Sequence, residues 1–165
     1  METAQNKIVK AALLGAGTVG SGVYQLVQER QEDFSHICGT QIQITKILVR
    51  DASKEREGIP SPLLTDNWNE IIEDDSISII IEVMGGIEPA KSYLLEAMKA
   101  GKQIVTANKD LIAEHGHELL DSAEKYGCDF LAASDVAEPS KEDREHLNEE
   151  GHKKLAEAVL EVLAA

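Results

Sequence analysis

The sequence is poor in cations, cysteine, proline and aromatic residues, and it has no long hydrophobic run. Its 165 residues carry 16 Lys and Arg against 30 Asp and Glu, which gives a formal net charge of −14. Nucleic acids and anionic membranes both require a basic surface, so we expect neither as a partner. An anionic small molecule remains compatible with this charge, because backbone amides and one or two local cations can hold a phosphate group.

Two further absences narrow the class of protein. The only cysteines, Cys38 and Cys128, have no metal-site spacing, and we expect two reduced thiols and no metal. Residues 1–7 are polar and lack the apolar segment of a secretory signal. The longest apolar run, residues 77–84, contains Ser78 and Glu82 and is far shorter than the roughly 20 apolar residues that cross a bilayer. We therefore expect a cytoplasmic protein with no membrane association.

What the sequence does contain is a glycine-rich turn between an apolar run that begins at residue 8 and a helical pattern. Gly15 permits a tight turn, Gly17 permits a pyrophosphate to approach the backbone, and Gly20 lets the helix lie close to the strand. Thr18 and Val19 open the helix, whose first N–H groups and positive dipole end attract phosphate. This context predicts a dinucleotide site. The alternative is a purely structural turn between a strand and a helix.

Strand and helix patterns alternate along the chain, with connections too long for hairpins. This alternation predicts an α/β fold, a Rossmann-like doubly wound parallel sheet of about six strands with helices on both faces. The segment from Glu29 to Thr40 is predicted as a polar connection, and Trp68 is expected to pack a helix on the sheet. The predicted strands are residues 8–14, 41–49, 63–65, 78–84, 103–106 and 128–132. The first helix is predicted to carry one apolar side made of Val19, Val23, Leu26 and Val27.

Two further strands end in unusual sequences at the edge where ligands bind in such sheets. The fourth ends in Met84-Gly85-Gly86, and the fifth is followed by Thr106-Ala107-Asn108-Lys109. Together with the first glycine turn, these segments suit a bound dinucleotide. We predict cofactor contacts from the two turns, by Met84, Gly85, Gly86, Thr106 and Asn108. The alternative is that the two glycines only start a helix and that Lys109 is solvated.

The end of the second strand bears on the choice of cofactor. An acidic residue there hydrogen-bonds the ribose of NAD, whereas an arginine accommodates the 2′-phosphate of NADP. The strand ends in Arg50-Asp51, with Lys54 and Arg56 close behind. Arg50 favours NADP, and Asp51 leaves NAD open.

Three blocks of the sequence form a more specific pattern than the glycine turn alone. They are Leu14-Gly15-Ala16-Gly17-Thr18-Val19-Gly20-Ser21-Gly22-Val23, Glu82-Val83-Met84-Gly85-Gly86-Ile87-Glu88-Pro89-Ala90, and Val105-Thr106-Ala107-Asn108-Lys109 with Ala113-Glu114-His115-Gly116. With these blocks the chain resembles the N-terminal nucleotide-binding domain of homoserine dehydrogenase, over about residues 7–131. The resemblance implies NAD(P)H-dependent interconversion of aspartate 4-semialdehyde and homoserine. It also implies that Lys109 is a catalytic residue beside the nicotinamide and the substrate, and that Gly85-Gly86 approaches the nicotinamide ribose.

The chain departs from that family after Leu131. In the family a second domain follows, with the substrate-binding carboxylates, another catalytic lysine and the dimer sheet, so we expect this chain to be catalytically silent and monomeric. Residues 143–158 instead resemble the end of SGNH (GDSL-type) hydrolases, with Asp143 and His146 at the spacing of that family's Asp–His pair. No matching Gly-Asp-Ser block is present, so we expect no acylation.

The predicted organisation is a dinucleotide-binding domain over residues 1–131, completed by a grafted loop and helix over residues 132–165. The join between two family resemblances suggests an engineered chimera. Two other functions remain open: an α/β scaffold that binds no ligand, and a hydrolase remnant.

Overall fold

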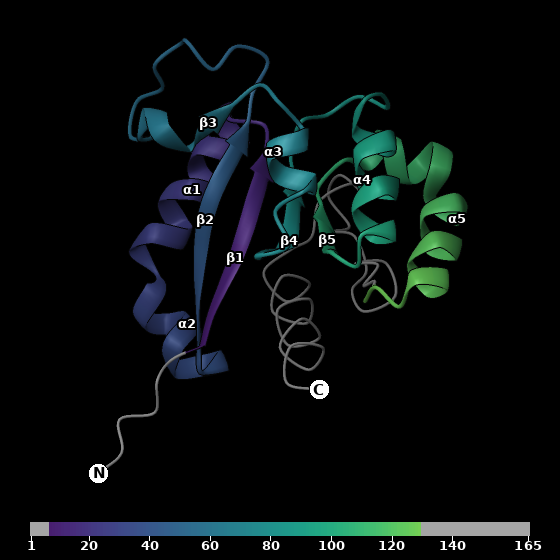
Figure 1. The fold of residues 1–165 in the computed structure, drawn as a ribbon, viewed down its shortest axis with the longest axis horizontal. Helices are drawn as coiled ribbons and strands as arrows, with labels where there is room; N and C mark the ends of the chain where they lie inside the picture. Colours follow the sequence, from purple (N-terminus) through teal and green to yellow (C-terminus); the bar gives the residue numbers. More distant parts are fainter. Residues whose placement is uncertain (1–6, 130–165) are drawn as a thin grey trace, which may run out of the picture. The chain divides into compact units, whose positions relative to one another are not determined.

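The computed structural model describes residues 7–129, and the first compact unit of the chain ends at Cys128. Its centre is a five-stranded sheet in the order β3-β2-β1-β4-β5, in which every pair of neighbours is parallel (Figure 1). The strands are β1 Lys7–Leu14, β2 Thr40–Leu48, β3 Leu64–Thr65, β4 Ile77–Glu82 and β5 Gln103–Thr106. The helices are α1 Thr18–Glu29, α2 Gln31–Cys38, the single turn η1 Ser61–Leu63, α3 Asn69–Ile72, α4 Ala90–Lys99 and α5 Lys109–Tyr126. The predicted doubly wound α/β fold is confirmed.

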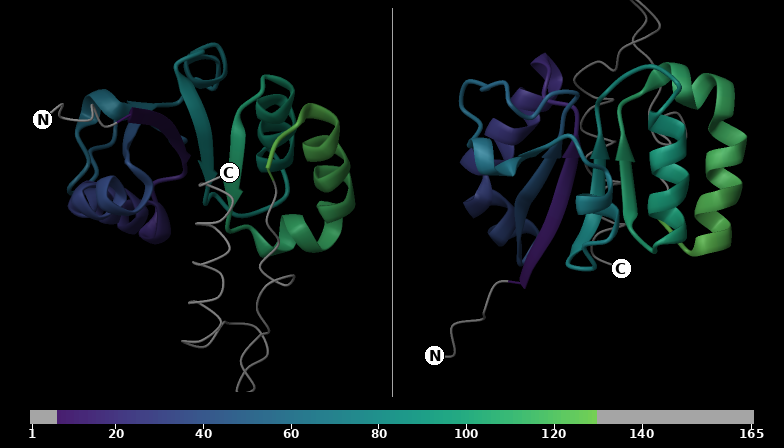
Figure 2. Two further views of the ribbon diagram at one scale, coloured as in Figure 1. Left: turned by 90° about the horizontal axis from the view of Figure 1, so that it is seen from below. Right: turned by 45° about the horizontal axis from the view of Figure 1, so that its top comes forward.

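Both faces of the sheet are covered. The last four residues of β1, Ala11–Leu14, are completely buried although side chains in a strand alternate between faces. Ala11 and Leu13 belong to a core with Tyr24 and Val27 of α1. The crossover from β1 to β2 through α1 and the crossover from β4 to β5 through α4 run in opposite directions along the sheet, so right-handed connections place α1 and α4 against opposite faces. In Figure 2, α1 and α2 lie beside β1 and β2, and α4 and α5 lie beside β4 and β5.

All five strands end at the same level. The strand order reverses at β1, which pairs with β2 on one side and β4 on the other, so the carboxyl edge at this strand is the topological switch point. The side-by-side terminal residues, from one edge of the described sheet to the other, are Thr65, Leu48, Leu14, Glu82 and Thr106. Segments that follow these residues therefore meet along one rim.

The segment between α1 and β2 corrects one prediction. Residues 29–40 were expected to be a polar connection, but Gln31–Cys38 forms helix α2. Glu32 and Asp33 lie in its first turn, where acidic side chains suit the helix dipole. Phe34 packs against the core, and Gly39 ends the helix with a φ of 61°. A single partly buried aromatic in a mostly polar run is too weak a periodic signal to identify a helix from the sequence.

Helix α1 also differs from its predicted packing. Val19 and Leu26 are 58% and 53% exposed, and the buried residues of the helix are Gly20, Tyr24 and Val27. The close approach of Gly20 to the sheet turns this side of the helix inward. Trp68 stacks on Tyr93 of α4 with ring centroids 4.5 Å apart, so it joins α3 to α4.

Several predictions concern the C-terminal part of the chain. The predicted strand at 128–132 extends past the described residues, and the hydrolase-like pair Asp143 and His146, the predicted helix at 148–163 and the join near residue 131 lie outside them. Within residues 7–129, no helix combines the length and the apolar character needed to cross a membrane.

Candidate functional site

The segment from Gly15 to Gly20 follows β1, and its backbone conformation is possible only because two of its residues have no side chain. Gly15 has a φ of +103°, and a Cβ there would lie 3.2 Å from the Cα of Met84. A Cβ on Gly20 would lie 2.1 Å from the carbonyl oxygen of Gly15, which is an impossible contact. A Cβ on Gly17 would meet no protein atom within 4 Å. Gly15 and Gly20 are thus required by the fold, whereas Gly17 borders open space.

The N-terminus of α1 opens onto this space. Gly17 is the N-cap residue and supplies no side-chain hydrogen bond, and the first N–H groups of a helix have no partner within the helix. Gly17, Thr18 and Val19 are exposed. Val19 is an apolar side chain left 58% exposed at the start of the helix. An exposed helix start with backbone donors and a positive dipole end suits a phosphate-bearing ligand.

The carboxyl end of β4 carries a buried acid. Glu82 is completely buried, and its Oε1 accepts hydrogen bonds from the backbone N–H of Met84 at 2.7 Å and of Gly85 at 3.3 Å. Its Oε2 accepts from the hydroxyl of Thr106 at 2.6 Å. Gly85 and Gly86 are exposed, each with a φ of +74°. This conformation favours glycine, so the two residues bring bare backbone to the rim.

The segment after β5 is tied to the same turn. Asn108 is 5% exposed; its Nδ2 donates to the carbonyl oxygen of Gly86 at 2.6 Å, and its Oδ1 accepts from the N–H of Leu111 at 3.1 Å. The Asn108 side chain therefore caps α5 and holds the glycine turn. Lys109, the first residue of α5, is exposed at the rim.

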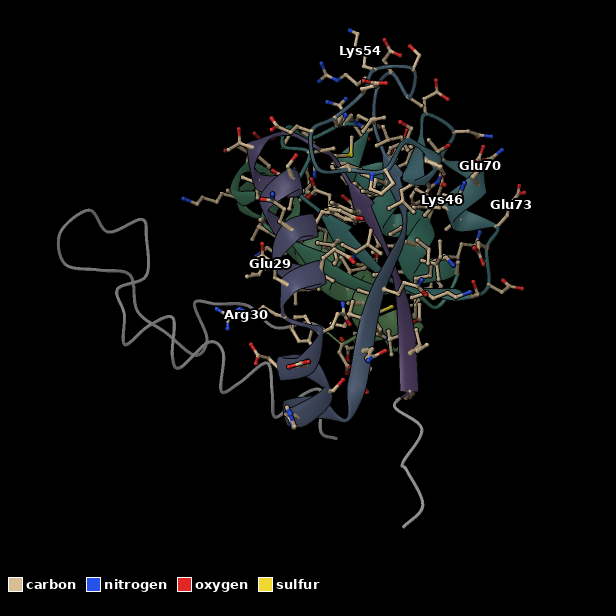
Figure 3. The ribbon with its side chains drawn as sticks, turned by 90° about the vertical axis from the view of Figure 1, so that its left-hand side faces the viewer. Glu29, Arg30, Lys46, Lys54, Glu70 and Glu73 are labelled. Atoms are coloured by element: carbon tan, nitrogen blue, oxygen red, sulfur yellow. The ribbon has the colours of Figure 1, made fainter. Side chains whose placement is uncertain are left out.

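The end of β2 contributes charge to the edge. Arg50 is exposed. The Asp51 carboxylate accepts from the backbone N–H of Ser53 at 3.0 Å and from its hydroxyl at 2.6 Å, and it pairs with Lys54 at 3.5 Å. The hydrogen bonds from Ser53, followed by the charge of Lys54, lower the pKa of Asp51. Lys54 lies at the tip of the loop that follows β2 (Figure 3).

The structure brings every predicted site residue to the carboxyl edge, at the ends of β1, β2, β4 and β5 or at the start of the turn or helix that follows each strand. The side chains of Thr106 and Asn108, predicted as cofactor contacts, are engaged within the protein. Their contacts with a cofactor remain predictions, as do those of the other residues. Sequence reasoning did not identify Glu82 as part of the site. The signal available was one acid at the end of an otherwise apolar strand. No group of His, Cys, Asp or Glu that could hold a metal is found in the described residues.

The fold and its edge define a Rossmann-like domain, and the comparisons identify which one. The family described as "Homoserine dehydrogenase, NAD binding domain" matches residues 15–133. The homoserine dehydrogenase of Bacillus subtilis is 43% identical over 132 residues, which is 79% of this chain and 30% of that protein. A crystal structure of Staphylococcus aureus homoserine dehydrogenase superposes with a TM-score of 0.73 at 46% identity, covering 81% of this chain and 34% of that one.

A homoserine dehydrogenase from Thiobacillus denitrificans superposes with a TM-score of 0.69 at 33% identity, over 80% of this chain and 31% of that one. The chain belongs to the family of homoserine dehydrogenase NAD-binding domains. It spans about 30% of the length of the curated relatives that it matches.

Proposed function

We propose that this chain binds a nicotinamide dinucleotide at the carboxyl edge of its sheet, as the nucleotide-binding part of a homoserine dehydrogenase. The observation that carries the proposal is the difference among the three glycines of the first turn. Gly15 and Gly20 are required by protein contacts, but Gly17 borders open space at an exposed helix N-terminus. A glycine without a steric reason inside the protein is explained by a ligand that needs the same space.

The residues at the edge fit such a ligand. Gly17, Thr18 and Val19 would hold the pyrophosphate through backbone N–H groups, and Gly85 and Gly86 would offer bare backbone to the nicotinamide half. A bound cofactor would donate a hydride to aspartate 4-semialdehyde to form homoserine, or accept it in the reverse reaction. Lys109 would lie beside the substrate, where a lysine ammonium can donate a proton to an oxygen that gains negative charge.

We further propose that NADP is preferred over NAD. Asp51 uses its carboxylate on Ser53 and Lys54, its own neighbours, so it is poorly placed to receive both hydroxyls of a ribose. Arg50 is exposed, and Lys54 extends from the same loop. Two cations at this position suit a 2′-phosphate.

That these 165 residues bind cofactor without turnover stays a prediction. A monomeric state, a cytoplasmic location and the hydrolase-like origin of the tail also stay predictions. The alternative function, a scaffold that binds no ligand, is separated from this proposal by one binding experiment.

The test is a titration of the 165-residue chain with NADPH and with NADH, followed by cofactor fluorescence. We expect saturable binding of both, tighter for NADPH. Arg50→Ala is expected to weaken NADPH binding about tenfold and to leave NADH within about twofold, since one charge-assisted contact is lost. Arg30→Ala is the control, because Arg30 is an exposed arginine at the end of α1 remote from this edge, paired with Asp33. If neither NADPH nor NADH binds, the scaffold that binds no ligand is favoured. Hydrolysis of an ester by the chain would favour the hydrolase remnant.

A further inference from the structure

The buried acid at the end of β4 has no part in the glycine turn after β1. Glu82 is completely buried, and burying a carboxylate is costly unless hydrogen bonds compensate it. Three donors do so here, namely the N–H groups of Met84 and Gly85 and the hydroxyl of Thr106. Two donors come from its own turn, and the third comes from the neighbouring strand, 24 residues further along the chain. The acid therefore connects two separate segments of the rim.

The connection closes into a ring of hydrogen bonds. Thr106 donates its hydroxyl hydrogen to Glu82 and accepts the N–H of Asn108 at 3.1 Å on the same oxygen. Asn108 then donates from Nδ2 to the carbonyl oxygen of Gly86 at 2.6 Å, which returns to the turn held by Glu82. We call the two segments, residues 84–86 and 106–109, the linked loops. Each hydrogen bond in the ring depends on the placement of the next, as in other buried polar networks.

We propose that Glu82 is a positioning residue: acting through Thr106, it holds the linked loops as one unit and so sets the backbone that faces the nicotinamide half of the cofactor. This inference rests on the proposed function, which assigns the linked loops to the cofactor site, but the linkage itself can be measured without cofactor. If Glu82 only stabilised the domain as a whole, loss of its hydrogen bond to Thr106 would not speed amide exchange specifically in the other loop.

The linkage is tested by amide hydrogen exchange in the full chain, with Thr106→Val and Thr106→Ser as a matched pair. Valine has the shape of threonine and removes the hydroxyl, whereas serine keeps it. In Thr106→Val, we expect the amides of Met84 and Gly85 in the other loop to exchange about tenfold faster, because Glu82 loses a donor and its orientation. In Thr106→Ser, their exchange stays within about twofold of wild type. Glu82→Gln is expected to act like Thr106→Val.

The amide of Val49 is the internal control, since it donates to the carbonyl oxygen of Thr65 at 2.8 Å on the other side of β1. Its exchange should not change in any of these variants. If the Met84 and Gly85 amides are unaffected in Thr106→Val, or if Val49 accelerates equally, the linkage is wrong.

The positioning role is tested by NADPH affinity of the same variants. We expect Thr106→Val and Glu82→Gln to bind NADPH about tenfold more weakly and Thr106→Ser to bind within about twofold of wild type. Faster exchange with unchanged affinity would overturn the positioning role. If wild type binds neither NADPH nor NADH, the proposed function and the positioning role fail together, and the exchange data still decide whether Glu82 links the loops.

Discussion

The glycine turn after β1 and the linked loops after β4 and β5 are neighbours on one rim, yet they are built by different physical means. In the turn, missing side chains fix the backbone, because a Cβ on Gly20 would lie 2.1 Å from the Gly15 oxygen. In the linked loops, side chains fix the backbone through hydrogen bonds to Glu82 and from Asn108. The turn is therefore disrupted when a side-chain atom is added, and the linked loops are disrupted when one is removed.

The largest expected effect comes from adding an atom to the turn. Gly20→Ala should lower the free energy of unfolding by about 3 kcal/mol or more, because the new Cβ meets backbone that cannot move aside. Urea unfolding followed by circular dichroism measures this change. NADPH binding should be lost as well.

Gly17→Ala is the matched control for that prediction. Its Cβ would meet no protein atom within 4 Å, so the loss of stability should be limited to about 1 kcal/mol, the ordinary cost of an alanine N-cap. NADPH affinity should fall about tenfold or more, since the methyl group enters the ligand's space. Equal losses of stability in both variants would mean that Gly17, too, is a structural glycine.

Removal of atoms from the linked loops should have the next largest effect. Asn108→Ala is expected to lower the free energy of unfolding by about 2 kcal/mol, because α5 loses its N-cap and the Gly86 oxygen loses a donor. Thermal and urea unfolding measure the loss.

Asn108→Ser separates the two contributions. Serine is also a good N-cap residue and can accept from the Leu111 N–H, but it lacks the Nδ2 group that donates to Gly86. We expect most of the stability to return while NADPH affinity stays reduced. Full recovery of affinity in Asn108→Ser would show that the bond to Gly86 contributes nothing to the site.

The smallest effect is expected away from both regions, at the ion pair between Lys46 of β2 and Glu70 of α3. These side chains point toward each other in Figure 3, with 2.7 Å between Nζ and Oε2. The hydrogen bond and then the charge of Lys46 lower the pKa of Glu70 in the folded state below its ordinary value of 4.5. The ion pair therefore stabilises the fold at pH values above 4.5, and this stabilisation is lost as the pH falls through the lower folded pKa.

Glu70→Gln should therefore unfold at slightly lower urea than wild type at neutral pH, and the difference should disappear well below pH 4.5. Because the pair is partly exposed, added salt should also reduce the difference. NADPH affinity should not change. A difference that persists in acid would show that Glu70 stabilises the domain by packing and not by its charge.

The difference between the glycine turn and the linked loops also explains which features could be predicted from the sequence. The glycine turn was predictable because the contact that requires Gly20 is with Gly15, only five residues earlier in the chain. The parallel fold was predictable because apolar strands alternate with helical patterns along the whole described chain. Both depend on contacts that are near in sequence or on a repeated pattern.

The role of Glu82 could not be predicted in the same way. Its hydrogen bond to Thr106 spans 24 residues, and it exists only because β4 and β5 end at the same level of the sheet. The exposure of Val19 and the existence of helix α2 were not predicted, for a related reason. Each depends on how a short segment meets the sheet, which the polar and apolar pattern of the segment does not encode.

The central claim is that a dinucleotide rests against bare backbone at the turn after β1. The most direct measurement is a map of backbone amide chemical shifts in the 165-residue chain during titration with NADPH. We predict the largest changes at the amides of Gly17, Thr18 and Val19, with further changes in the linked loops. Saturating changes confined to other parts of the chain, or no changes at all, would contradict it.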